Sequence, residues 1–230
     1  MSRSILLLGA TGLVGRECLR LLAARDDYDR IVVLARRRPE REPDSSRVEW
    51  HVVDFDRLTR YAAFFQVDQI LCALGATMKQ AGSRERFRAV DLLYPVTAAH
   101  LGLEKGARHF LLVSAMSANK HSPFFYSRMK GELEHQLKAL PYKSLTIVRP
   151  SILLGQRDKA RHLERAAAFI SLAAPRRFRA VKATDVAAAV VSAAAADQRG
   201  VRMISSASLA GVLTGGNALQ TSNAAVTVAG

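Results

Sequence analysis

A glycine-spaced turn near the amino end constrains this chain more than any other feature. A short apolar run at residues 5–8 leads into Gly9-Ala10-Thr11-Gly12-Leu13-Val14-Gly15, and a helical pattern follows at once. A buried strand, a turn and a helix in this order direct backbone N–H groups and a helix N-terminus at one point, where a pyrophosphate binds. Gly9 would permit the tight turn, Gly12 would leave room for the phosphates, and Gly15 would let the helix pack close to the strand.

We therefore predict a dinucleotide site at this turn. The spacing is G-x-x-G-x-x-G, and an ordinary strand-to-helix turn with chance glycines is the alternative. The predicted phosphate-binding residues are Gly9, Thr11, Gly12, Leu13, Val14 and Gly15.

Strand-like and helix-like segments alternate along most of the chain. This order predicts an α/β fold, a Rossmann-type doubly wound parallel sheet with helices on both faces and a small C-terminal substrate-side region. The predicted strands span residues 5–8, 31–35, 48–53, 69–74, 109–114, 144–149 and 200–205. The predicted helices span residues 15–25, 58–65, 85–105, 126–140, 161–173 and 186–196, the last capped by Thr184 or Asp185.

The length of 230 residues, of which 49% are hydrophobic, suits one domain with a full core. We expect a single NAD(P)-binding domain over residues 1–208, in which residues 151–208 contribute the substrate side. Residues 209–230 carry no charge, and we expect them to form a flexible tail.

The net charge of +14 raises the question of a nucleic-acid partner. The basic residues are scattered over nearly every segment and are not interleaved with aromatic residues, which is typical of a solvated surface. Their densest cluster, Arg36-Arg37-Arg38 with Arg41, falls where a phosphate ligand is expected for another reason. Nucleic-acid binding is therefore a minor hypothesis.

The end of the second predicted strand bears on the choice of cofactor, because a carboxylate at this place usually binds the adenosine ribose of NAD. Here the strand ends in arginines, and Arg36 and Arg37 can bind a 2′-phosphate through their planar guanidinium groups. We therefore predict NADP(H) as the cofactor; solvated arginines are the alternative. Asp54, after the third strand, is expected near the adenine amino group, although it could equally cap a turn. Small residues after the fourth strand should let a flat cofactor pass: Ala73, Leu74 and Gly75.

A second constellation joins Ser114 with Tyr126 and Lys130. The phenol and the ammonium are four residues apart and lie on one helical face. A nearby ammonium favours phenolate, so we expect it to lower the pKa of Tyr126 from its usual value near ~10 and to make the hydroxyl a usable general acid or base. Ser114, at the end of the fifth strand, would hold the substrate oxygen, and Lys130 would also bind the nicotinamide ribose. A surface pair without a role is the alternative.

Two cysteines, Cys18 and Cys72, fall in a predicted helix and a predicted strand, which suits a reducing environment, and we expect a cytoplasmic protein. The first apolar run is too short to span a membrane and continues into the glycine turn, so we interpret it as a strand and expect no membrane partner. The six histidines show no metal-ligand spacing, and no metal site is expected.

Taken together, these motifs resemble the short-chain dehydrogenase/reductase superfamily over residues 3–208. Within it, the chain is similar to the atypical branch that includes the Tat-interacting protein family. The matching segments are the glycine turn, Cys72-Ala73-Leu74-Gly75, Val90-Asp91, Ser114, Tyr126 through Glu132, and Arg149-Pro150-Ser151-Ile152-Leu153-Leu154-Gly155. The resemblance implies bound NADPH, Tyr126 and Lys130 in the catalytic positions, and Pro150 and Ile152 near the nicotinamide ring. The asparagine usual in the long fourth helix of the superfamily has no clear match, and Asp91 is the nearest candidate.

Two functions follow as expectations. The first is an NADPH-dependent oxidoreductase of a small carbonyl or alcohol substrate, and the second is a cofactor-binding regulator, as the resemblance implies for several atypical members. The expected partner is a small-molecule substrate; a homodimer or a regulatory protein partner stays open.

Overall fold

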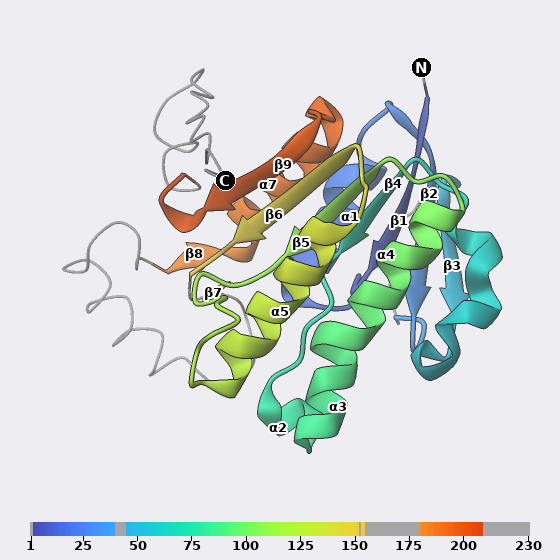
Figure 1. Cartoon of the computed structure of the whole chain (residues 1–230). Coiled ribbons are helices and arrows are strands. Elements are labelled where there is room, and N and C mark those ends of the chain that lie inside the picture. The colour runs from blue at the N-terminus through green and yellow to red at the C-terminus, as the bar shows by residue number, and fades with distance from the viewer. Residues whose placement is uncertain (1, 40–44, 152, 155–179, 209–230) are drawn as a thin grey trace.

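A seven-stranded parallel sheet forms the centre of the computed structural model, which describes residues 2–39, 45–151, 153–154 and 180–208 (Figure 1). Its strand order is β3-β2-β1-β4-β5-β6-β9, and each neighbouring pair is parallel. The strands are β1 (Arg3–Leu8), β2 (Tyr28–Ala35), β3 (Val48–Val52), β4 (Gln69–Cys72), β5 (His109–Val113), β6 (Ser144–Arg149) and β9 (Gly200–Ser205). The order reverses between β1 and β4, which is the switch point of a Rossmann sheet, and the predicted fold is confirmed.

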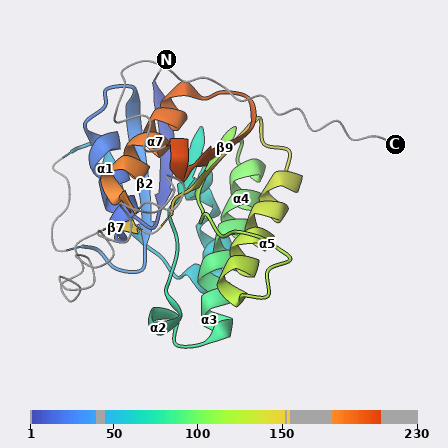
Figure 2. The same ribbon diagram turned by 90° about the vertical axis from the view of Figure 1, so that its left-hand side faces the viewer.

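Helices cover both faces of this sheet (Figure 2). On one side, α1 (Leu13–Ala23) packs against α7 (Ala183–Ala196). On the other side lie the 3₁₀ segment η1 (Phe55–Phe65), α4 (Tyr94–Glu104) and α5 (Phe125–Ala139). Three short helical segments precede α4 directly: α2 (Met78–Ala81), α3 (Arg84–Arg88) and the π-helical turn η2 (Ala89–Leu93).

The core has two layers because successive strand residues point to opposite faces. In β1, Ile5 and Leu7 pack into the layer under α1 and α7, whereas Leu6 and Leu8 pack into the layer under α4 and α5. All four side chains are fully buried. This burial on both faces explains why the strand reads as a continuous apolar run.

Several predicted boundaries differ from the structure. The predicted helix over residues 85–105 is three consecutive segments, α3, η2 and α4, and the predicted helix over residues 58–65 is part of η1. The predicted cap by Thr184 or Asp185 is wrong, since α7 begins at Ala183 and Lys182 is its N-cap without a side-chain hydrogen bond. The reason is a short strand pair, β7 (Leu153–Leu154) with β8 (Val181–Lys182), which keeps Lys182 extended up to the start of the helix. The predicted helix at 161–173 and the predicted tail at 209–230 lie outside the described residues.

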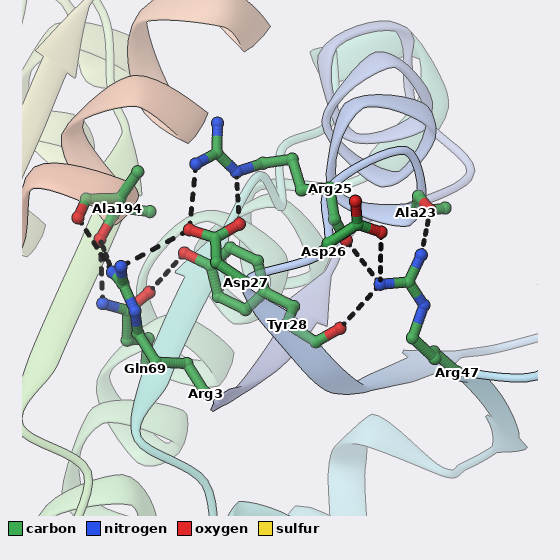
Figure 3. Close-up of polar contacts among 10 residues, drawn as sticks. Arg3, Ala23, Arg25, Asp26, Asp27, Tyr28, Arg47, Gln69 and Ala194 are labelled. Atoms are coloured by element: carbon green, nitrogen blue, oxygen red, sulfur yellow. Dashed lines mark hydrogen bonds and ion pairs between the residues drawn. The ribbon is translucent and has the colours of Figure 1, made fainter. Parts of the chain in front are cut away.

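Polar side chains bind the ends of helices at the amino edge of the sheet (Figure 3). Arg3 donates to the carbonyl of Ala194 at 3.2 Å, and the amide of Gln69 donates to the same carbonyl at 2.9 Å. Arg47 donates to the carbonyl of Ala23, at the end of α1, at 3.0 Å. These contacts satisfy carbonyls that a helix C-terminus leaves without partners. The opposite, carboxyl edge of the sheet is where the strand ends carry the predicted site.

Candidate functional site

The glycine turn after β1 is shaped by two close backbone approaches. Gly9 has a φ of 87°, a conformation that side chains disfavour, and a Cβ on it would lie 2.5 Å from the carbonyl oxygen of Ala73. A Cβ on Gly15 would lie 2.1 Å from the carbonyl oxygen of Gly9. The turn therefore brings α1 directly against the end of β1, and β1 against the end of β4.

Gly12 lies at the exposed N-terminus of α1. It is the N-cap and offers no side chain to the N–H groups of Leu13, Val14 and Gly15, which have no acceptor within the helix. Among the described residues, a Cβ on Gly12 would lie within 4 Å of one atom, the carbonyl oxygen of Gly9 at 3.3 Å, so little of this part of the chain fills the space beside it. Free amides, a helix N-terminus and open space suit the diphosphate of a dinucleotide.

The ends of β2 and β3 differ in what their polar residues contact. Arg36 and Arg37 are exposed, and neither has an ion pair or hydrogen bond within the part of the chain that the structure describes. Asp54 caps η1, because its carboxylate accepts from the backbone N–H of Asp56 at 3.0 Å, and Arg57 lies 3.8 Å away. Asp54 thus caps η1, as its alternative role predicted, and its place near the adenine stays a prediction. Within the described residues, Arg36 and Arg37 have no partner that would compete with a ligand.

The end of β4 connects the glycine turn to the Tyr126–Lys130 pair. Ala73 and Leu74 are half-buried and Gly75 is exposed. A Cβ on Gly75 would lie 3.6 Å from Oδ1 of Asp91 and 3.8 Å from Nζ of Lys130. The predicted cofactor residues and the predicted catalytic residues are therefore contiguous along this edge.

Tyr126 and Lys130 lie on the first turns of α5, as the i,i+4 spacing predicts. Lys130 is buried, and its Nζ forms an ion pair with Oδ1 of Asp91 at 2.8 Å. Tyr126 is 41% exposed, and its ring meets Phe87 of α3 edge-on at 5.9 Å between centroids. Tyr126 is thus partly exposed, with its ring packed against Phe87, while the ammonium of Lys130 is buried.

The expectation that Lys130 lowers the pKa of Tyr126 is wrong in its net direction. Burial of the ring raises the pKa of Tyr126; Lys130 acts to lower it, and Asp91 adds a further rise. Burial acts to lower the pKa of Lys130, but the charges of Asp91 and Tyr126 outweigh this effect and raise that pKa. At neutral pH the pair is therefore a phenol beside an ammonium.

Ser114 follows β5 and is buried. Its hydroxyl donates to Oε1 of Glu134 at 2.5 Å, and Nε of Arg149 donates to the same oxygen at 2.9 Å. The hydroxyl proton of Ser114 is thus directed to α5 and not presented to a substrate. Sequence reasoning missed Glu134, although its place four residues after Lys130, on the same helical face, was a usable signal.

The remaining predicted positions add little evidence about the site. Pro150 is buried, and its carbonyl accepts from the N–H of Met116 at 2.9 Å. Ile152 lies outside the described residues. Among the described residues, no three His, Cys, Asp or Glu side chains gather as a metal site would require, so the absence of a metal stays a prediction.

The parallel sheet, its switch point and the open N-terminus of α1 define a nucleotide-binding Rossmann protein. The chain belongs to the family whose model is described as NAD(P)H-binding, which matches residues 9–197. The resemblance stated from the sequence is confirmed at this level.

Sequence relatives support the same family assignment. The protein HTATIP2 of Rattus norvegicus is 33% identical over 162 residues, covering 70% of this chain and 66% of the relative. Protein FMP52, mitochondrial, of Lodderomyces elongisporus is 34% identical over 169 residues, covering 70% of this chain and 71% of the relative. The match thus spans about two thirds of the length of these relatives.

Solved structures share the fold at low sequence identity. The Bordetella bronchiseptica enzyme WbmH in complex with NAD+ superposes with a TM-score of 0.71 at 15% identity, covering 89% of this chain and 76% of that one. UDP-N-acetylglucosamine 4-epimerase from Bacillus cereus superposes with a TM-score of 0.65 at 19% identity, covering 89% of this chain and 79% of that one. At these identities the likeness concerns the fold alone.

The expectation of a cytoplasmic protein is contradicted, because the fungal relatives carry the word mitochondrial in their names. Cys18 and Cys72 are buried and unpaired, and burial raises the pKa of Cys18 to about 12. Unreactive thiols of this kind indicate no particular compartment, which is why the inference failed. Among the described residues, none of the helices combines the length and the apolar character that crossing a bilayer requires.

Proposed function

We propose that this chain is an NADP(H)-dependent oxidoreductase that interconverts a small carbonyl substrate and its alcohol. The observation that carries the proposal is the continuity of the carboxyl edge: Gly9 abuts Ala73, and Gly75 abuts the side chain of Lys130. A nucleotide with its diphosphate at the open N-terminus of α1 would extend along this edge toward Tyr126.

The preference for NADP(H) is supported by Arg36 and Arg37. Both are exposed at the end of β2 without a partner among the described residues, which leaves their planar guanidinium groups free to bind a 2′-phosphate. A carboxylate that would accept from a ribose hydroxyl is missing from this strand end in the sequence.

When bound, a nicotinamide supplies the hydride for the carbonyl carbon. Tyr126 donates its phenolic proton to the carbonyl oxygen and recovers a proton from solvent, to which it is 41% exposed. Lys130 would donate to the nicotinamide ribose. Ser114, expected to orient the substrate oxygen, would first have to leave its hydrogen bond to Glu134.

That hydrogen bond favours a second candidate, an NADP(H)-binding regulatory protein with weak turnover or none. With Ser114 held by Glu134 and Lys130 held by Asp91, two of the three predicted catalytic groups already have partners. Such a protein would act through a protein partner.

The experiment combines calorimetry with a carbonyl panel. NADPH should bind more tightly than NADH, and the wild type should oxidise NADPH with at least one carbonyl. Tyr126→Phe should lose that activity and keep nucleotide affinity. Tight NADPH binding without turnover across the panel would favour the regulator, and failure to bind either nucleotide would exclude both candidates.

A further inference from the structure

Asp91 is a fully buried carboxylate beside the Tyr126–Lys130 pair. Its Oδ1 lies 2.8 Å from Nζ of Lys130, and its Oδ2 accepts from the backbone N–H of Ala76 at 2.8 Å. Each oxygen therefore has a fixed partner, one on α5 and one after β4. A carboxylate held in this way cannot turn toward solvent.

The backbone around Asp91 is also unusual. It lies in η2, a single π-helical turn between α3 and α4. A π-turn inserts one extra residue into a helix, is rare, and is frequent at functional sites. Here the turn buries Asp91 and Leu92 and leaves Leu93 exposed. The chain thus accepts an irregular helix at the place where a carboxylate meets Lys130.

The charges that face Tyr126 balance. From its own helix it faces Lys130, and from η2 it faces Asp91. Cys72, on β4, also faces Lys130, but burial raises the pKa of this thiol to about 11, so it is neutral. Among the described residues, one positive and one negative charge therefore act on the phenol, beside the larger effect of its burial. An unpaired ammonium next to the phenol would favour the phenolate, and Asp91 opposes that effect.

We propose that Asp91 biases this site toward reduction: by pairing with the ammonium of Lys130 it withholds that charge from a phenolate on Tyr126, so that the tyrosine is adapted to give a proton to a carbonyl and not to take one from an alcohol. The inference rests on the proposed function and assigns it a direction. In reduction the proton passes from Oη of Tyr126 to the carbonyl oxygen, while the hydride, with its electron pair, comes from NADPH to the carbonyl carbon. Alcohol oxidation instead requires a phenolate at the outset, which the paired ammonium stabilises poorly.

The test follows the titration of Tyr126 directly in the full chain, without nucleotide or substrate. Tyrosines labelled with ¹³C at Cζ are observed by NMR between pH 6 and 11, and the resonance of Tyr126 is the one lost in Tyr126→Phe. The wild-type midpoint should lie above about 10, the ordinary value for tyrosine. Asp91→Asn, which keeps the size of the side chain, should lower it by about one pH unit or more, since an unopposed cation has effects of that size.

Asp56→Asn is the matched control, because Asp56 is a carboxylate that accepts from the hydroxyl of another tyrosine, Tyr94. It should bring the titration of Tyr94 toward the observed pH range, from the pKa of about 12 to which burial and Asp56 raise it, and leave Tyr126 unchanged. A midpoint of Tyr126 that does not move in Asp91→Asn would overturn the proposal. A wild-type midpoint below about 9 would overturn it without any variant, even if Asp91→Asn did not fold.

Because no turnover is measured, this outcome is separate from the fate of the proposed function. A shifted titration in a chain that reduces no carbonyl would support the role of Asp91 and reject the oxidoreductase. If turnover is found, carbonyl reduction by the wild type should stay level up to the midpoint of Tyr126, and Asp91→Asn should raise alcohol oxidation at pH 7 relative to reduction.

Discussion

The hydroxyl of Ser114 donates a hydrogen bond to Oε1 of Glu134 at 2.5 Å, and both residues are buried. The same carboxylate also binds the guanidinium of Arg149, whose Nε lies 2.9 Å from Oε1. One buried carboxylate therefore joins the ends of β5 and β6 to α5, one helical turn beyond Lys130. This junction sets how α5 lies on the carboxyl edge, and with it the position of Tyr126.

Glu134→Gln should lower the free energy of unfolding by about 1–3 kcal/mol, because Ser114 and Arg149 lose a charged acceptor inside the protein. Urea unfolding measures the loss. Glu132→Gln is the control, since within the described part of the chain Glu132 accepts from Gln136 on the same helix alone, at 2.8 Å, and such pairs contribute less than about 0.5 kcal/mol. Equal losses in the two variants would show that the junction has no special weight.

Gly12→Ala and Gly15→Ala should separate binding from folding. A Cβ at position 15 would lie 2.1 Å from the backbone of Gly9, and we expect a loss of about 3 kcal/mol in unfolding free energy. Among the described residues, a Cβ at position 12 meets one backbone atom, at 3.3 Å, so Gly12→Ala should cost far less stability than Gly15→Ala while it weakens nucleotide binding. Thermal unfolding and calorimetry give the two readings. Full nucleotide affinity in Gly12→Ala would place the diphosphate elsewhere.

Arg36→Asp should shift the preference from NADPH toward NADH by about tenfold or more, the value of a charge-assisted hydrogen bond to phosphate. The ratio of the two dissociation constants is the measurement. Arg199→Asp changes the net charge equally at the amino edge, directly before β9, and should leave the ratio unchanged. If the two variants behave alike, Arg36 does not contact the cofactor.

His109 should make the fold less stable as the pH falls from about 7 toward 5.5. It is fully buried, with Nδ1 2.8 Å from Asp197, and burial lowers its pKa although Asp197 acts to raise it. The unfolded chain therefore takes up a proton near pH 6.5 that the folded chain does not, so stability present above this pH is lost below it. The lowered pKa of Asp68 removes stability only at more acidic pH, near and below about 4.

Urea unfolding at pH 7.5 and 5.5 measures this effect. His109→Gln should be less stable at pH 7.5 and should show a smaller difference between the two values. His121→Gln, in the exposed loop before α5, should keep the wild-type difference. A wild-type free energy that does not change between pH 7.5 and 5.5 would contradict the prediction.

The sheet and the glycine turn could be predicted because their signals are local. Buried parallel strands are continuous apolar runs, and Gly9 and Gly15 are required by backbone contacts within the turn or with a neighbouring strand. The i,i+4 spacing of Tyr126 and Lys130 was equally reliable, because helix geometry alone places them on one face. Helix boundaries were less predictable: the π-turn at η2 and the extension of Lys182 depend on packing and strand pairing.

The sequence alone therefore determines which residues lie along the carboxyl edge of the sheet, because strand ends, turns and helical spacing follow from short-range sterics. What those residues do to one another was decided by packing. Ser114 meets Glu134, and Lys130 meets Asp91, across 20 and 39 positions of the chain. Desolvation of a phenol and neutralisation of an ammonium are properties of the surrounding atoms, and they reversed the direction of a pKa shift that spacing alone predicted for Tyr126.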